Sequence, residues 1–170
     1  MKVAVDSSSI ILLAKAGLLM EACKLAELLT TKEVEAEVMR GLAKGKADAL
    51  QAKRLIEGRK IRVVNPNARV SNKLQEDFGL GLGEATALAL VAVEKIALLT
   101  DDNKARKAGK ILGAQVLSSL DFPVVLFAKK VIQKERAVAA VKSLQRHGWF
   151  NESLIIEALA QLEKMGGEKK

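Results

Sequence analysis

The sequence predicts an α/β fold in which a mainly parallel sheet carries helices on both faces. Short apolar or β-branched runs alternate with helical segments from the first residue onward, which is typical of parallel strands joined by crossover helices. The length of 170 residues is that of one ordinary domain, roughly 100–200 residues. We therefore expect a single domain over residues 1–165, followed by a disordered basic tail over residues 166–170.

Each predicted strand is a short run bounded by turn or cap residues. The first run is apolar and ends in Asp6, as expected of a buried strand that leads into a helix. A later β-branched run stops at Asn65-Pro66-Asn67, which is a turn signal. The predicted strands cover residues 2–5, 28–30, 61–64, 96–100 and 115–117.

The predicted helices follow from caps, stops and periodicity. Three serines after Asp6 are N-cap candidates, and Gly17 is expected to stop the helix that they begin. Thr30 and Glu33 have the spacing of a capping box for a helix ending at Gly41. A glycine-rich linker precedes an almost wholly apolar segment, expected to be a central helix. These predicted helices cover residues 7–16, 18–24, 32–40, 47–57, 71–78, 84–94 and 103–110.

From residue 123 onward the chain is expected to be helical, with one break near His147 and a second close to the carboxyl terminus. Trp149 and Phe150 are interpreted as a packing anchor for the last helix, and Asn151 is its expected cap. The chain thus ends in a helical extension of the predicted sandwich.

Composition excludes several chemistries. A single cysteine, Cys23, rules out an internal disulfide and Cys-rich zinc clusters. A single histidine, His147, rules out a mechanism that uses two histidines as acid and base. Asp6 interrupts the apolar stretch that would resemble a signal peptide, and no apolar run reaches the ~18 residues of a membrane span. We therefore expect a cytoplasmic protein that does not associate with membranes.

Positive charge is concentrated in one part of the chain. Residues 103–146 contain ten Lys or Arg and two acidic residues, which accounts for the whole net charge of +8. Such a segment indicates a polyanionic partner, nucleic acid first, and the alternative is a solvated helical surface. Aromatic residues make up only 3%, which argues against base-stacking platforms of the single-strand-binding type.

Five carboxylates are candidates for one site. Asp6 follows the first strand, and Asp101 and Asp102 follow the fourth, so they belong to the edge where parallel strands end. Glu84 opens the central helix, and Glu37 flanks the apolar stripe of its own helix. Carboxylates packed together resist ionisation, whereas a divalent cation removes that penalty. Oxygen ligands without imidazole or thiolate select Mg²⁺ or Mn²⁺.

An acidic centre within a basic surround predicts a metal-dependent nuclease. A bound cation lowers the pKa of a water molecule and stabilises charge on the leaving oxygen, while basic residues hold the phosphate backbone. Each carboxylate also has a structural alternative. Asp6, Asp101 and Asp102 are candidate helix caps, Glu84 complements a helix dipole, and Glu37 is a candidate solvated residue. Capping and metal binding are compatible for the aspartates.

Four segments, together with the end of the chain, resemble the PIN-domain ribonucleases. The segments occur in that family's order and at its spacing, and they cover residues 3–8, 34–38, 83–88 and 99–106. Residues 148–152 and the following helix resemble a prokaryotic subgroup related to VapC-type toxins. The similarity extends over nearly the whole chain, although the helical length after residue 122 departs from the family pattern.

The resemblance implies a three-layer α/β/α sandwich acting as an endoribonuclease with Mg²⁺ or Mn²⁺. It implies RNA as the substrate, with a homodimer and a cognate antitoxin as partners if the protein is the toxin of a type II toxin–antitoxin pair. The implied catalytic residues are Asp6, Glu37 and Glu84, with Asp101 or Asp102 at the last acidic position, which varies in the family. The implied metal ligands are Asp6, Glu84 and either Asp101 or Asp102. The expected substrate contacts are Ser8, Lys104, Arg106 and Lys107.

Two alternative functions use a similar fold. A catalytically inactive RNA-binding or regulatory module would keep the basic surround without turnover. A phosphotransfer receiver-like domain would also gather acids at strand ends, but it needs an acidic pair after the first strand. Asp6 stands alone at that position, so the receiver is the weaker alternative.

Overall fold

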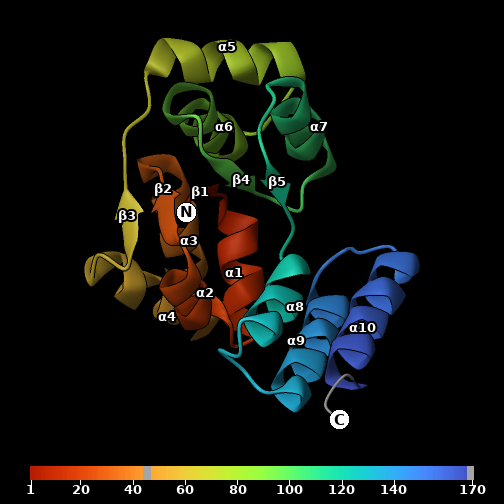
Figure 1. Ribbon diagram of the computed structural model, residues 1–170. Helices are drawn as coiled ribbons and strands as arrows, with labels where there is room; N and C mark the ends of the chain where they lie inside the picture. The colour runs from red at the N-terminus through yellow and green to blue at the C-terminus, as the bar shows by residue number, and fades with distance from the viewer. Residues whose placement is uncertain (44–46, 168–170) are drawn as a thin grey trace.

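The computed structural model describes residues 1–43 and 47–167, and within them the centre of the protein is a five-stranded parallel sheet (Figure 1). The strand order is β3-β2-β1-β4-β5, and every neighbouring pair is parallel. The strands are β1 (Lys2–Val5), β2 (Glu27–Thr30), β3 (Ile61–Val63), β4 (Ala97–Leu99) and β5 (Val116–Leu117). Each lies where the sequence predicts a strand.

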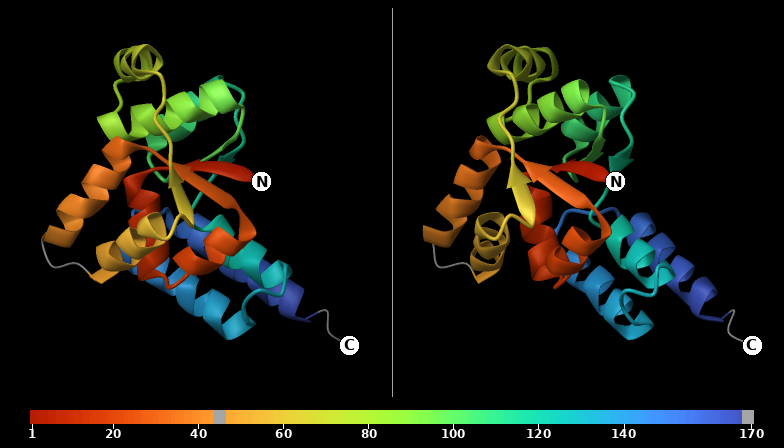
Figure 2. Two further views of the ribbon diagram at one scale, coloured as in Figure 1. Left: turned by 90° about the vertical axis from the view of Figure 1, so that its left-hand side faces the viewer. Right: turned by 60° about the vertical axis from the view of Figure 1, so that its left-hand side comes forward.

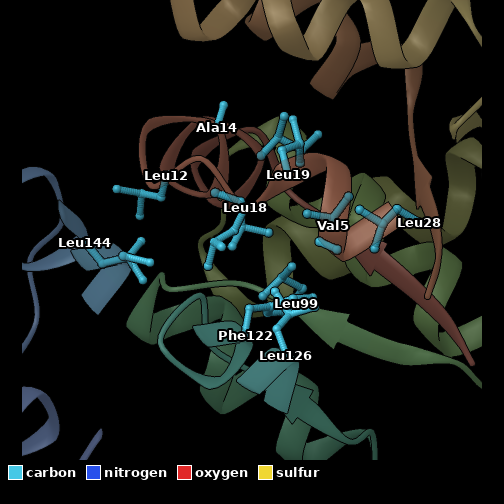
Figure 3. Close-up of a cluster of buried hydrophobic side chains, with 14 of the residues drawn as sticks. Val5, Leu12, Ala14, Leu18, Leu19, Leu28, Leu99, Phe122, Leu126 and Leu144 are labelled. Carbon is cyan, nitrogen blue, oxygen red and sulfur yellow. The ribbon is translucent and has the colours of Figure 1, made fainter. Parts of the chain in front are cut away.

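Side chains alternate across the sheet and pack into two separate cores. Val5 belongs to one core together with Leu28 and Leu99 from the neighbouring strands (Figure 3). Ala4 and Leu98 belong to the other core. Because successive strand residues point to opposite faces, helices cover both faces. The predicted three-layer α/β/α sandwich is therefore confirmed.

The helices divide between the two faces of the sheet. Three of them bury residues in the core that contains Ala4, and in Figure 1 they lie above the sheet: α5 (Ala68–Phe78), α6 (Leu82–Glu94) and α7 (Asn103–Ile111). The others described contribute to the core that contains Val5: α1 (Ser7–Lys15), α2 (Leu19–Leu25), α3 (Lys32–Ala43), α4 (Ala47–Glu57), α8 (Asp121–Ala128), α9 (Lys134–His147) and α10 (Glu152–Gly167). None of the helices in the described ranges is both long and apolar enough to cross a membrane.

The last three helices form the expected helical extension and pack against one another (Figure 2). All three helices bury residues in the core that contains Val5, where Phe122 and Leu126 of α8 lie beside Leu99 (Figure 3) and Leu144 belongs to α9. A break between α8 and α9, at residues 129–133, was not predicted. The break predicted near the carboxyl terminus is wrong, because α10 continues to Gly167. Residues 166 and 167 of the predicted tail therefore belong to this helix. The rest of that tail, residues 168–170, lies outside the described residues.

Helix α3 differs from its prediction at both ends. It continues through Gly41 to Ala43, because Leu42 still packs against the core. The residue that caps its first turn is Thr31, whose Oγ1 accepts a hydrogen bond from Val34 N at 3.3 Å. The predicted cap, Thr30, instead donates from Oγ1 to a β1 carbonyl oxygen at 3.2 Å. Burial and cross-strand bonding therefore override the local spacing.

Helices α5 and α6 both begin earlier than predicted. Asn67 Oδ1 accepts a hydrogen bond from Arg69 N at 2.9 Å, so the turn signal after β3 is also the cap of α5. Gly79 ends α5 in the left-handed conformation, with φ of 60°. Helix α6 begins at Leu82, inside the glycine run. The predicted linker is therefore a tight connection between two helices.

The basic segment at residues 103–146 does not form one continuous surface. Helix α7 covers the face of the sheet that also carries α6, whereas α9 packs on the opposite face. In α9, Arg136 forms an ion pair with Glu21 at 2.8 Å, and Lys134 forms one with Glu163 at 2.6 Å. The basic residues are thus contiguous in the sequence but lie on opposite faces of the sheet in the structure, and some of them form ion pairs with acidic residues.

Candidate active site

A cavity of about 580 Å³ opens at the carboxyl edge of the sheet. Its wall includes the residues that follow β1 and β4, together with residues from α3 and α6. The carboxylates that line it belong to Glu37, Glu84, Asp101 and Asp102. Because parallel strands end at the same edge of a sheet, side chains far apart in the sequence meet here. Four of the five predicted carboxylates therefore share one cavity.

Asp6, the fifth carboxylate, lies behind this cavity and is only 2% exposed. Its Oδ1 accepts hydrogen bonds from Ser9 N at 2.8 Å and from Ser8 Oγ at 3.0 Å, and its Oδ2 accepts one from Thr100 Oγ1. Burial raises the pKa of Asp6 from 3.8 to about 6, while the hydrogen bonds, that from Thr100 foremost, act to lower it. Asp6 is also the N-cap of α1, which confirms its capping alternative, whereas the three serines predicted as N-cap candidates lie inside the helix.

Glu37 and Glu84 meet at the first turn of α6. Ser7 Oγ donates a hydrogen bond to Glu37 Oε2, which links α1 to α3. The Glu37 carboxylate lies against Gly83, where a Cβ atom would be 2.8 and 2.9 Å from its two oxygens. Glu84 turns back over Gly81, the N-cap of α6. A side chain at either glycine would have to displace these carboxylates, and the helix dipole stabilises negative charge at this end of α6.

The two aspartates that follow β4 have different surroundings. Asp101 Oδ1 accepts hydrogen bonds from Ser118 Oγ at 2.7 Å and from Ser119 N at 3.0 Å. Asp101 Oδ2 is buried and has no hydrogen-bond partner within the described residues. Asp102 Oδ1 accepts from Ala105 N at 2.8 Å and caps α7. The capping alternative is therefore confirmed for Asp102 and wrong for Asp101.

The carboxylates share a cavity without being gathered into a coordination sphere. Across residues 1–43 and 47–167, no three Asp, Glu, His or Cys side chains are grouped closely enough to hold a metal ion as they stand. Glu37 is held by Ser7, and Asp101 is held through one oxygen by the segment after β5. The donor types nevertheless fit a hard divalent cation. The unpartnered Oδ2 of Asp101 is the acceptor that such an ion would satisfy.

Comparison with known proteins identifies the family. A family model described as a PIN domain matches residues 2–164. The chain belongs to the PIN domain family. Its fold is similar to that in the crystal structure of PAE2754 from Pyrobaculum aerophilum, with a TM-score of 0.54 and 19% identity over 75% of this chain and 99% of that chain. No curated protein sequence matches the chain significantly. The match over residues 2–164 confirms the predicted PIN family, whose members are commonly metal-dependent nucleases.

The four predicted substrate contacts take different places in this PIN domain. Ser8 lines the carboxylate cavity. Arg106 lies outside it and donates from Nη1 to backbone carbonyls at the ends of β4 and β5, at 3.1 and 3.3 Å. Lys104 donates from Nζ to a carbonyl oxygen after α5 at 3.4 Å, and Lys107 is exposed. Neither lysine lines the carboxylate cavity. Arg106 thus supports the two strand ends, and Ser8 is the one of the four predicted contacts that lines the cavity.

Several residues of the PIN domain site were not predicted. Thr100 hydrogen-bonds to the first carboxylate, and its place directly after a strand could have signalled it. Asn103 and His147 line the cavity from the start of α7 and the end of α9. Trp149 also lines it and is fully exposed, so its predicted role as a packing anchor is wrong. Phe150 packs against the core instead. No sequence pattern distinguishes the roles of these two neighbouring aromatics.

Proposed function

We propose that this PIN domain is an endoribonuclease that hydrolyses RNA phosphodiester bonds with Mg²⁺ or Mn²⁺. The observation that supports this most strongly is the shared cavity of Glu37, Glu84, Asp101 and Asp102 at the carboxyl edge of the sheet. Carboxylates collected in one cavity repel one another, and a cation together with a polyanionic substrate would offset that repulsion. The net charge of +8 favours association with RNA.

The residues that would hold the cation are Glu84, Asp101 and Asp102, with Asp6 directly behind the cavity wall. When bound, the ion would lower the pKa of a water molecule and stabilise negative charge on the leaving oxygen. Asp6 is fixed by three hydroxyl or amide donors, so its negative charge is oriented before substrate arrives. Ser8, one of these donors, also lines the cavity.

Glu37 is the residue that we propose to accept a proton from the attacking water. Ser7 holds one of its carboxylate oxygens, so the carboxylate has a fixed orientation beside the cavity. In the proposed step, the water oxygen forms a bond to phosphorus, the water proton passes to the carboxylate, and one P–O ester bond breaks. The leaving oxygen takes a proton from solvent. Glu37 then returns its proton to solvent.

The test is cleavage of single-stranded RNA by the wild type and by Asp6→Asn. We expect wild-type cleavage that requires Mn²⁺ or Mg²⁺ and is stopped by a chelator. Asp6→Asn should lose this activity while its circular dichroism spectrum stays unchanged, because Asn fits the same buried space. Exposed Asp77, on the outer surface of α5, provides the matched control Asp77→Asn. Full activity of Asp6→Asn would refute the assignment.

The second candidate is a catalytically inactive RNA-binding or regulatory module. The observation that favours it is that no three acidic, imidazole or thiol groups in the described ranges are assembled for a metal ion. It predicts RNA affinity that persists in chelator, with no turnover under any divalent metal. Cleavage that depends on Glu84 would rule it out.

A narrower role rests on the resemblance of residues 148–152 to VapC-related proteins. On that basis we propose a cytoplasmic toxin of a type II pair that forms a homodimer and is blocked by a cognate antitoxin. Expression of the wild type should then arrest growth, whereas Glu84→Gln should not. Sedimentation should show a dimer. Growth unaffected by an active wild-type nuclease would refute the toxin role alone.

A further inference from the structure

Trp149 is the single tryptophan in the sequence, and its side chain is fully exposed (103%). The four phenylalanines are all buried or half-buried. Leaving an indole in water forgoes the roughly 150–250 Å² that an aromatic side chain usually buries. Tryptophan is enriched where one molecule covers another, so the exposed indole is a candidate contact for a partner.

The connection between α9 and α10 holds Trp149 outward. Gly148 N donates a hydrogen bond to Leu144 O at 2.8 Å, which ends α9. Phe150 packs against the core and folds over Gly148 so closely that any Cβ atom there would collide with its ring. The residues on both sides of Trp149 are therefore held in place. Its exposure follows from the fixed path of the backbone.

The indole stands where two cavities meet. One is the carboxylate cavity, and the other has a volume of about 380 Å³ and is bounded by α8 and α10. Among the residues that the structure describes, only Asp101, Asn103 and Trp149 line both. The lining of the second cavity is divided about equally between polar and apolar residues, and Val125 and Leu154 are exposed on its wall. Its apolar part suits the face of a base, and its carboxylates disfavour a phosphate group.

We propose that Trp149 stacks on an unpaired base of single-stranded RNA and so positions the neighbouring phosphodiester at the carboxylate cavity. This inference rests on the proposed nuclease function and adds a residue that positions the RNA substrate. One exposed indole is a single stacking contact and not the platform of several aromatic residues that the 3% aromatic content argues against. An indole face stacks on any base, whereas bases within a duplex are already stacked on their neighbours. The second cavity then receives the nucleotide on the other side of the indole. Trp149 is thus a positioning residue and takes no part in proton transfer.

The first measurement uses the emission of the one tryptophan. Oligoadenylate is titrated into wild-type protein in the presence of a chelator, which prevents turnover. We expect saturable quenching by the single strand. A duplex of oligoadenylate with oligouridylate and inorganic polyphosphate, which has charge but no bases, should leave the emission nearly unchanged. Equal quenching by all three probes would overturn the inference, because charge alone would then explain binding.

The second measurement compares the kinetics of Trp149→Ala, Trp149→Phe and Ile156→Ala. Loss of one stacked base should raise KM for single-stranded RNA about 5- to 100-fold with little change in kcat, and Trp149→Phe should restore most of the affinity. The exposed side chain supports no packing, so Trp149→Ala should remain folded. Ile156 is the matched control, since it is exposed on α10 and lines neither cavity.

The outcomes separate this inference from the proposed function. Metal-dependent cleavage with an unchanged KM in Trp149→Ala would overturn the stacking role and leave the nuclease intact. Absence of cleavage, combined with quenching by oligoadenylate and weaker RNA binding by Trp149→Ala, would support stacking and refute the nuclease. Emission that depends on protein concentration and not on RNA would overturn the inference, since a second copy of the chain would then cover the indole.

Discussion

The two ends of the parallel sheet each carry a cavity, and the two cavities differ in chemistry. At the carboxyl end, about 580 Å³ is lined by four carboxylates and two serines. At the amino end, about 310 Å³ is lined by aliphatic residues, Gln115 and two lysines, Lys2 and Lys95. No carboxylate lines the amino-end cavity in the described part of the chain. The difference in volume is less informative than the reversal of charge.

Chain direction explains this reversal. Each strand leads into a helix at its carboxyl end, so helix N-termini and their caps collect there. Asp6 caps α1 and Asp102 caps α7, while Glu84 lies in the first turn of α6. Helix α6 runs back and ends at Lys95, beside the amino-end cavity. Helix dipoles favour carboxylates at one end and cations at the other, so the local caps and the site have a common electrostatic origin.

The largest effect is expected from a substitution that changes the carboxyl-end cavity and leaves the amino-end cavity unchanged. Glu84→Gln removes one carboxylate from the shared cavity, and we expect metal-dependent RNA cleavage to fall roughly 100-fold or more. Glu94→Gln is the matched control, because Glu94 is an exposed residue at the opposite end of the same helix. Initial rates in Mn²⁺ measure both variants. Equal losses in both would show that the two helix ends do not differ in function.

The next effect concerns pH and the burial of Asp6. Its pKa is about 6 when folded against 3.8 as the ordinary value, so the folded metal-free protein holds its proton more tightly than the unfolded chain. The free energy of unfolding should therefore fall as pH rises from about 4 to about 6, by up to about 3 kcal/mol. Urea unfolding across this range measures the loss.

Asp6→Asn should remove that pH dependence, because the amide does not titrate. At pH 7 the metal-free variant should be more stable than the wild type, and the two should converge below pH 4. An unchanged slope of stability against pH in Asp6→Asn would contradict the assignment of the effect to this carboxyl.

A smaller effect is expected at Thr100, the residue that follows β4. Thr100 Oγ1 donates to Asp6 and accepts from Asp102 N at 3.2 Å. Thr100→Val keeps the shape of the side chain but leaves the Asp6 carboxylate and the Asp102 amide without this partner. The free energy of unfolding should therefore fall by about 1–3 kcal/mol. The same change should raise the pKa of Asp6 further, since the hydrogen bond from Thr100 lowers it. NMR titration measures that pKa, and an unchanged value would contradict the coupling.

The smallest effect lies at the amino end. Lys95 ends α6 with φ of 55° and ψ of 44°, a left-handed conformation that favours glycine. Lys95→Gly should stabilise the protein by about 0.5–1 kcal/mol without altering RNA cleavage. Lys95→Ala, which retains the Cβ atom, is the matched control and should bring no gain. Thermal unfolding compares them, and equal stability of the two variants would contradict the strain at Lys95.

Much of the fold and of the carboxylate set follows from neighbours in the chain. The strands could be predicted because each is a short apolar run closed by turn or cap residues, as Asp6 closes the first. The cap of α7 was predictable for a similar reason, since Asp102 stands just before a helical segment. These features depend on backbone propensities within a few residues, which the order of side chains encodes directly.

Other features depended on packing between distant elements. Capping at α3 moved from Thr30 to Thr31 because Thr30 bonds across the sheet. Asp101 proved to be held by the segment after β5, while the equally plausible Asp102 became the cap. Trp149 and Phe150 are adjacent and both aromatic, yet one is exposed and the other packed. The local sequence pattern does not predict these differences, because they depend on the space that the packing of distant elements leaves for each side chain.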